Sequence, residues 1–156
     1  MCLGGGPTRR GFDYDRNVFP CPQGLRMNRS IGSITLVVDD YDRAIDYYTR
    51  ALGFALLEDI DLGGGKRWVR VAPAAGAQTA LLLAQAADEN QRARIGDQTG
   101  GRVGFFLHTD DFHRDHAAMR AQGVRFLESP RVETYGTVAV FEDLYGNRWD
   151  LLELKA

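Results

Sequence analysis

The pattern of apolar and polar positions occurs twice along the chain. The segment VVDDYDRAIDYYTRALGFALLED (37–59) is matched by LHTDDFHRDHAAMRAQGVRFLES (107–129), with an offset of 71 residues at the start and 70 after the helical part. The 70-residue offset returns where GAQTALLLA (76–84) is matched by GNRWDLLEL (146–154). A long pattern that occurs twice indicates a duplicated module rather than a solenoid.

Each copy predicts one strand, one helix and three further strands. In the first copy ITLVV (34–38) predicts a buried strand, and Asp39 or Asp40 can cap the helix that follows. Apolar residues then recur at helical spacing, with Tyr41 and Tyr48 in the core-facing stripe, until Gly53 ends the helix. The further strands of this copy are expected at about 54–60, 66–72 and 79–85. The second copy predicts a strand at 102–109, a helix at 111–121 and strands near 124–128, 136–142 and 148–154.

These elements predict an α+β fold made of two βαβββ modules. The first module spans 31–85, a polar linker spans 86–101, the second module spans 102–156, and 31–156 forms one compact domain. One face of each sheet is covered by the helix and the other is left apolar and open. We therefore expect the two modules to meet and form a curved mixed β-sheet around a concave cleft, which is the expected binding site.

Residues 1–30 differ from the rest of the chain. They contain Gly4-Gly5-Gly6-Pro7 and show no lasting periodicity, which predicts a flexible extension. Two alternatives stay open: Met27 is the true start of the protein, or the extension is a regulatory or dimer-bridging arm.

Composition excludes several classes of function. The apolar fraction of 44%, the charged fraction of 26% and the net charge of −2 are those of a globular protein without a nucleic-acid or acidic-membrane partner. No apolar run reaches the roughly 18–20 residues that a membrane span needs. Both cysteines, Cys2 and Cys21, lie near the start, without C-x-x-C spacing, and no secretory signal precedes the modules. We expect a cytoplasmic protein.

The paired modules carry a resemblance to a known family. The strand–Asp-Asp–helix–Leu-Gly-Phe opening and the D-x-x-G-N-x-x-(acid)-L close resemble the vicinal oxygen chelate superfamily, which contains glyoxalase I, bleomycin-resistance proteins and extradiol dioxygenases. The resemblance covers about 31–154. It implies the fold and, by analogy, a homodimer, sometimes with exchanged modules. It does not imply one reaction, because the scaffold serves lyases, dioxygenases, epimerases and drug binders.

The resemblance also locates four positions where metal-using members hold their ion. They lie on the first and last strand of each module, and the repeat places them at Ser33, Ala80, Gly104 and Asp150. Catalytic zinc, nickel or ferrous sites rest on about three His or carboxylate ligands. Since only Asp150 is such a ligand, we predict no cofactor, and the pattern argues against an extradiol dioxygenase.

Other polar residues are expected near the cleft. His108 shares a strand face with Phe106 and is either a general acid/base and ligand contact or a half-solvated strand end. Arg148 lies on the same strand face as Asp150, and the two either bind a ligand carboxylate or compensate each other. Trp68 and Arg70 share a face of the 66–72 strand, but the alternative inward set, Arg67, Val69 and Val71, stays open. The predicted ligand-binding residues are Ser33, Trp68, Arg70, His108, Tyr135, Arg148 and Asp150.

The sequence thus favours a protein resembling the glyoxalase and bleomycin-resistance family that binds a small aromatic or amphipathic molecule without a family-type metal site. The alternative is a metal-dependent lyase or isomerase resembling glyoxalase I (lactoylglutathione lyase type), with a divalent metal near His108 and Asp150. A metal-free enzyme that uses one of these two side chains as a general base is the third possibility. Whether the protein is an enzyme is left open.

Overall fold

The computed structural model describes residues 29–155, so the predicted extension lies, except for its last two residues, outside the described part. The first module is a four-stranded sheet of order β1-β4-β3-β2, in which β1 and β4 are parallel. Its elements are β1 (Ser33–Val38), α1 (Tyr41–Asp46), the π-helical continuation η1 (Tyr47–Ala51), β2 (Ala55–Gly63), β3 (Lys66–Ala72) and β4 (Ala80–Gln85).

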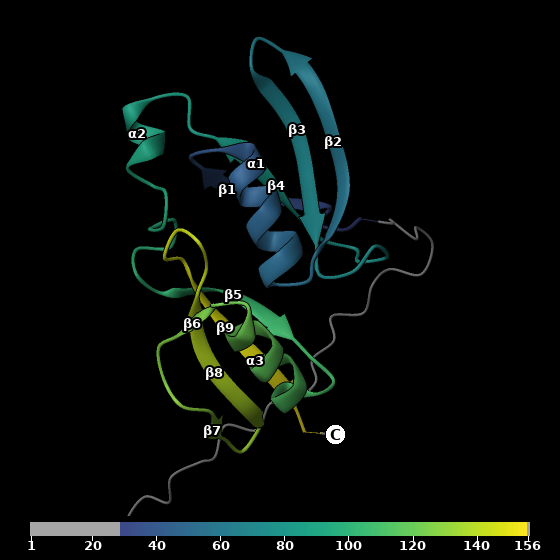
Figure 1. Cartoon of the computed structure of the whole chain (residues 1–156), viewed down its shortest axis with the longest axis vertical. Helices are drawn as coiled ribbons and strands as arrows, with labels where there is room; N and C mark the ends of the chain where they lie inside the picture. Colours follow the sequence, from purple (N-terminus) through teal and green to yellow (C-terminus); the bar gives the residue numbers. More distant parts are fainter. Residues whose placement is uncertain (1–28, 156) are drawn as a thin grey trace, which may run out of the picture.

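The second module repeats this arrangement, with strand order β5-β9-β8-β6 and a short strand β7 that also pairs with β8. Its elements are β5 (Val103–His108), α3 (Phe112–Ala121), β6 (Arg125–Phe126), β7 (Arg131–Val132), β8 (Gly136–Glu142) and β9 (Arg148–Leu154). The two modules lie one above the other in Figure 1, joined by a segment that contains the short helix α2 (Glu89–Arg92). The predicted α+β fold class is confirmed.

The strand predicted near 124–128 is shorter than expected, and β7 was not predicted. The reason lies beside β8, where the backbone N–H of Val140 donates to a Glu128 side-chain oxygen at 3.1 Å instead of continuing a strand ladder. Pro130 follows two residues later and has no backbone N–H to offer. A side chain therefore interrupts the strand, which hydrophobic alternation does not reveal.

The helices of the two modules, α1 and α3, begin directly after equivalent aspartates. Asp40 Oδ1 accepts from the backbone N–H of Arg43 at 2.8 Å, and Asp111 Oδ1 accepts from that of Arg114 at 3.0 Å. Such N-caps satisfy one of the backbone donors that a helix leaves unpaired. The Asp-Asp pairs of the repeat thus fix where each helix begins.

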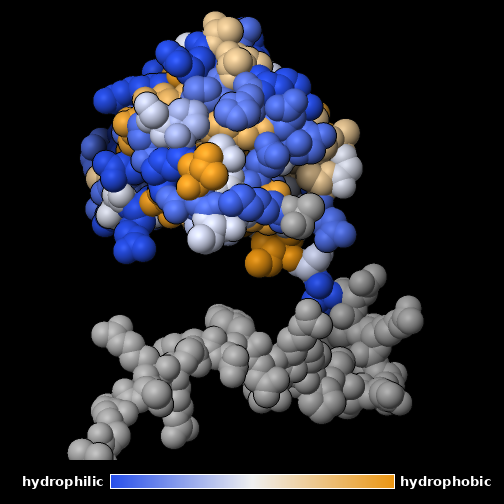
Figure 2. Space-filling view, turned by 90° about the horizontal axis from the view of Figure 1, so that it is seen from below, coloured by the Kyte–Doolittle hydropathy of each residue, from blue (hydrophilic) through white to orange (hydrophobic). Residues whose placement is uncertain are grey.

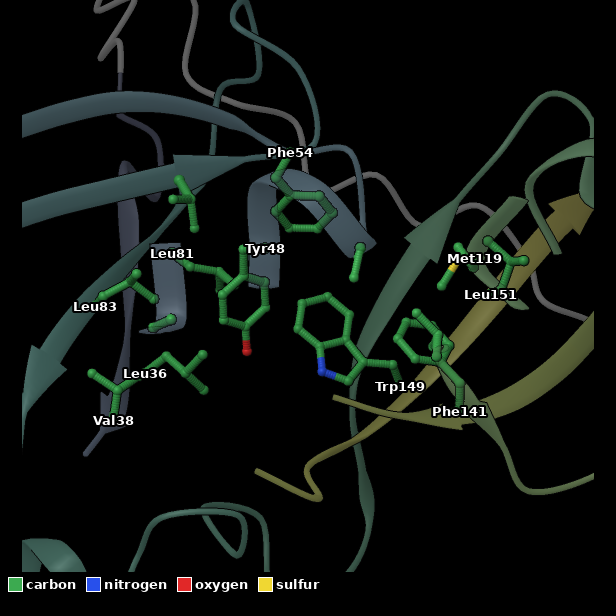
Figure 3. Packing of buried hydrophobic residues seen from close by; sticks show 14 of the residues in the cluster. Leu36, Val38, Tyr48, Phe54, Leu81, Leu83, Met119, Phe141, Trp149 and Leu151 are labelled. Atoms are coloured by element: carbon green, nitrogen blue, oxygen red, sulfur yellow. The ribbon is translucent and has the colours of Figure 1, made fainter. Parts of the chain in front are cut away.

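The modules meet through the sides of their sheets that carry the helices. Tyr48 and Phe54 of the first module pack against Trp149 of the second, with ring centroids 6.3 and 6.1 Å apart. Figure 3 shows these rings between the aliphatic residues of the two sheets. We call the opposite side of each sheet its helix-free face. The sequence suggested that the two modules would bury their helix-free faces against each other. Within one chain the modules instead share a core on the helix side, where Tyr48 is fully buried.

The orientation of β3, which the sequence left open, is decided by this core. Val69 and Val71 are fully buried on the helix side. Alternation along a strand then places Trp68 and Arg70 on the helix-free face. The same rule places Asp150 on the helix-free face of the second sheet.

The surface is predominantly polar on the side seen in Figure 2, where apolar residues appear in small groups rather than as one continuous patch. Among residues 29–155 no helix has the length and apolar character that crossing a membrane requires.

We predict that Asp111→Ala lowers the free energy of unfolding by about 1 kcal/mol, because the first turn of α3 loses its cap. Asp110→Ala is the matched control, since Asp110 makes only an exposed ion pair with Arg114 and its loss should change stability by a few tenths of a kcal/mol. Urea unfolding followed by circular dichroism measures both. Equal effects of the two substitutions would show that the cap has no special weight.

Candidate functional site

A buried carboxylate joins the two modules on their helix side. Asp143 is 6% exposed, and its Oδ2 accepts from the Tyr48 hydroxyl at 2.7 Å, from Asn147 Nδ2 at 2.9 Å and from Trp149 Nε1 at 3.2 Å. Its Oδ1 accepts from the backbone N–H groups of Tyr145 and Asn147. In Figure 3 the Tyr48 hydroxyl and the Trp149 nitrogen lie on the same side of the packed rings. We call this the Asp143 junction.

The electrostatics of the Asp143 junction fix the direction of its hydrogen bonds. Burial, together with the charge of Asp143, raises the pKa of the Tyr48 phenol well above its ordinary value. The phenol therefore stays protonated and donates to Asp143. The D-x-x-G-N part of the family-like motif thus has a structural role, because its aspartate and asparagine belong to this junction.

On the helix-free face of the first sheet, three predicted site residues come together. Arg70 Nε donates to Ser33 Oγ at 3.1 Å, and Arg70 Nη1 donates to Glu58 Oε2 at 3.1 Å. The same carboxylate oxygen accepts from Trp68 Nε1 at 2.8 Å. Glu58 therefore orients the indole and the guanidinium at once.

Glu58 was missed by the sequence analysis of the site. The hydrogen bond from Trp68, and then that from Arg70, lower its pKa, so it is ionised at neutral pH. A signal was present in the repeat, because Glu58 is matched by Glu128 at the 70-residue offset, and each directly follows two apolar residues. Only the pairing of β2 with β3 shows that Glu58 lies directly across from Arg70.

On the helix-free face of the second sheet, Asp150 lies between Phe106 on β5 and Val140 on β8. Its Oδ1 is buried and has no hydrogen-bond partner among residues 29–155. Desolvation raises the pKa of Asp150, the charge of Glu128 adds to this effect, and Arg131 opposes it. Phe106 is 60% exposed beside it.

The other predicted residues do not join these groups through any hydrogen bond within the described chain. Arg148 donates to the backbone oxygen of Gly101 at 2.9 Å and forms no ion pair with Asp150, so of the two roles left open for this pair the structure does not show mutual charge compensation. The reason is the bend of the chain before β5, which presents a carbonyl to the guanidinium. His108 is exposed at the end of β5, and Tyr135 is exposed before β8.

A groove opens where β3 and β4 diverge. The two strands pair only over Val69–Val71, so the outer end of the β2–β3 hairpin leaves the sheet, as Figure 1 shows. The groove has a volume of about 650 Å³ and is lined by, among others, Thr35, Tyr41, Lys66, Trp68, Leu82 and Gln91. Sequence analysis missed it because hydrophobic alternation predicts strands but not how far two of them stay paired.

The four family-type metal positions fit an ion poorly. Ser33 and Ala80 are direct partners on β1 and β4, and Gly104 lies against Thr99, whose Cγ2 would be 2.4 Å from a Cβ at that glycine. Of these three residues only Ser33 has a side-chain oxygen, its hydroxyl, which is a poor metal ligand. Among residues 29–155 no three His, Cys, Asp or Glu side chains gather in a way that would hold a metal.

The fold and the arrangement of its sites define a protein of the Glyoxalase/Bleomycin resistance protein/Dioxygenase superfamily. The model of this family matches residues 30–151, and the chain belongs to the family. Over 129 residues it is 53% identical to an uncharacterized protein of Shewanella frigidimarina (strain NCIMB 400), covering 82% of this chain and 96% of that protein.

Two solved structures show the same architecture. One is that of UcmS2, with 29% identity and a TM-score of 0.70 over 81% of this chain and 98% of the other. Another is that of TnmS3, described as an antibiotic binding protein from Streptomyces sp. CB03234, with 29% identity and a TM-score of 0.67 over 84% of this chain and 100% of the other. The expected family resemblance is confirmed.

We predict that Tyr48→Phe lowers the free energy of unfolding by roughly 1–3 kcal/mol, because the buried Asp143 loses a donor. Tyr47→Phe is the matched control: the neighbouring phenol makes only a long contact of 3.4 Å to the Glu142 backbone oxygen, so its loss should cost much less. Urea unfolding measures the difference, and equal losses would contradict the special role of the Asp143 junction.

We predict that Asp150→Asn stabilises the protein at about pH 7. Because the folded-state pKa of Asp150 is raised, the wild type loses stability as the pH rises from the ordinary value of 3.8 through the raised value. The asparagine variant lacks this loss, so its advantage should shrink when the pH falls to about 4. Urea midpoints at the two pH values test this. An advantage independent of pH would mean that the carboxylate charge is not the cause.

Proposed function

We propose that the protein binds a small aromatic or amphipathic molecule on its helix-free sheet faces, without a family-type metal site. The observation that carries the proposal is the arrangement around Glu58. Trp68 is 40% exposed although its indole N–H is held, and Arg70 beside it is held at two of its nitrogens. Such pre-organised aromatic and cationic groups lose little conformational entropy on binding.

The similarity to TnmS3 supports the same class of function, since that protein is described as antibiotic binding. The donor-poor metal positions favour binding over metal-dependent lyase chemistry. The proposed ligand contacts are Ser33, Trp68 and Arg70 on the first sheet and His108 and Asp150 on the second, with the cytoplasm as the expected compartment. Tyr135 and Arg148 stay predictions.

We further propose that the site is shared between two copies of the chain in a homodimer. Trp68 and Phe106 lie on the helix-free faces and are 40% and 60% exposed. The strands β1 and β5 are edge strands, so within residues 29–155 no other strand pairs with their outer sides, although the backbone N–H of Val37 on β1 donates to Gln98 Oε1 at 2.9 Å. A second copy that places its second module against the first module of its partner would cover both features, as isologous interfaces do.

The ligand proposal predicts that a library of planar aromatic compounds contains members that raise the melting temperature, because binding to the folded state stabilises it by mass action. Trp68→Ala should abolish these shifts or raise at least tenfold the ligand concentration that produces a given shift. This is the change expected when an aromatic contact worth about 1.4 kcal/mol or more is lost. Val132→Ala, at an exposed apolar position on β7, is the control and should retain them.

Two results would contradict the ligand proposal. One is that every compound that raises the melting temperature of the wild type raises that of Trp68→Ala by the same amount. The other is turnover that requires added divalent metal and disappears in Asp150→Ala, which would favour a lyase or isomerase of the glyoxalase I type.

The shared site predicts complementation between two impaired variants. Trp68→Ala and Phe106→Ala each damage a different module, so a dimer that combines the two chains holds one site with both substitutions and one intact site. After unfolding and refolding a 1:1 mixture, about a quarter of all sites should bind as in the wild type. Light scattering gives the mass, and calorimetry counts the sites. A monomer, or a mixture that binds no better than its components, rules out the shared site.

A further inference from the structure

The groove between β3 and β4 carries an inference about the ligand that rests on the proposed binding function. We propose that this groove receives an aromatic anion, with its ring against Trp68 and its negative charge at Lys66. The groove's volume of about 650 Å³ lies within the range of ordinary small-molecule sites, about 300–1,000 Å³.

The charge of the groove is the first argument. The whole chain has 21 acidic and 19 basic residues, yet the residues that line the groove include Lys66 and Arg67 and no aspartate or glutamate. Arg67 is paired with two carboxylates that lie outside the lining, so the uncompensated charge of the groove is that of Lys66, which attracts anions and repels cations. The groove therefore selects for a negatively charged ligand.

Only one of the two cations is available to a ligand. Arg67 donates to Asp42 at 2.7 Å and pairs with Asp59 across the hairpin, so its guanidinium is occupied. Lys66 precedes it on the strand, is exposed and has no ion pair or hydrogen bond from its ammonium within residues 29–155. The ammonium of Lys66 is thus the group that meets the ligand's charge.

The walls of the groove suit a flat ring that carries acceptors. Trp68 forms one side, and Leu82 and Ala84 add apolar surface from β4. Tyr41 accepts the backbone N–H of Arg67 at 3.3 Å, which leaves its own hydroxyl hydrogen free to donate. Gln91 accepts through Oε1 from the N–H of Ala87, so its amide NH₂ also remains a donor.

The negative charge of Glu58 does not oppose this ligand. Glu58 does not line the groove, and its carboxylate is engaged by Arg70 and by the Trp68 indole N–H. Its part is that of a positioning residue, because it holds the indole at the angle that forms the groove wall.

A pair of probes of equal shape tests the inference. We expect 2-naphthoate to bind at least about tenfold more tightly than its neutral analogue 2-naphthamide, as a charge-assisted hydrogen bond implies. Quenching of tryptophan fluorescence measures both affinities. The chain has two tryptophans; Trp149 is buried, and Trp68→Phe identifies the signal that arises in the groove.

The substitution Lys66→Gln should remove the preference for naphthoate and leave the affinity for naphthamide within about twofold, since it removes charge and keeps an amide donor. Lys155→Gln is the matched control: Lys155, the chain's other lysine, donates to the Glu133 backbone oxygen in the second module, and its substitution should leave the preference intact.

The outcomes separate the two proposals. Equal binding of both probes by the wild type, or a preference that survives Lys66→Gln, overturns the anion inference and leaves the binding function standing. Failure of both probes to bind at millimolar concentration contradicts the groove as a ligand site, whereas the library screen decides independently whether the helix-free faces bind any aromatic compound.

Discussion

The Asp143 junction is the interaction on which the arrangement of the two modules depends. It brings the Tyr48 hydroxyl of the first module and the Trp149 indole of the second to one buried carboxylate oxygen. A buried carboxylate is costly unless it is hydrogen-bonded, and here both oxygens have donors. The first module's helix is thereby held against the second module's sheet, and the shared core forms on that side.

Because the modules share their helix side, side chains on the opposite sheet faces such as Trp68 and Phe106 stay exposed. The two faces are not alike, although the modules are related by duplication. The first carries Glu58 with Trp68 and Arg70 and borders a groove whose lining has no carboxylate. The second presents Asp150 beside Phe106, and one Asp150 oxygen has no hydrogen-bond partner in the described part of the chain. At the position equivalent to Arg70 the second module has Val140, so duplication preserved the fold and left the chemistry of each face to diverge.

The repeat in the sequence predicts where residues lie on their elements but not which partners their long side chains bind. The repeat located most of the strands, the helix caps at Asp40 and Asp111, and the placement of Asp150 on its strand, but it missed β7. It predicted Arg148 as the companion of Asp150, but the guanidinium turns to the Gly101 carbonyl instead. A long side chain can reach several partners, and alternation along one strand determines only the sheet face on which its Cβ lies.

The sequence by itself determined the family, the two βαβββ modules and the lack of a side-chain donor at two of the four metal positions, Ala80 and Gly104, because these depend on periodicity, local capping and residue type. The tertiary structure decided the orientation of β3, the joint role of Glu58, the extent of the β3–β4 pairing and hence the groove. It also showed that Asp143 joins the modules. These features depend on register and on contacts between residues up to 95 positions apart, which local sequence patterns do not encode.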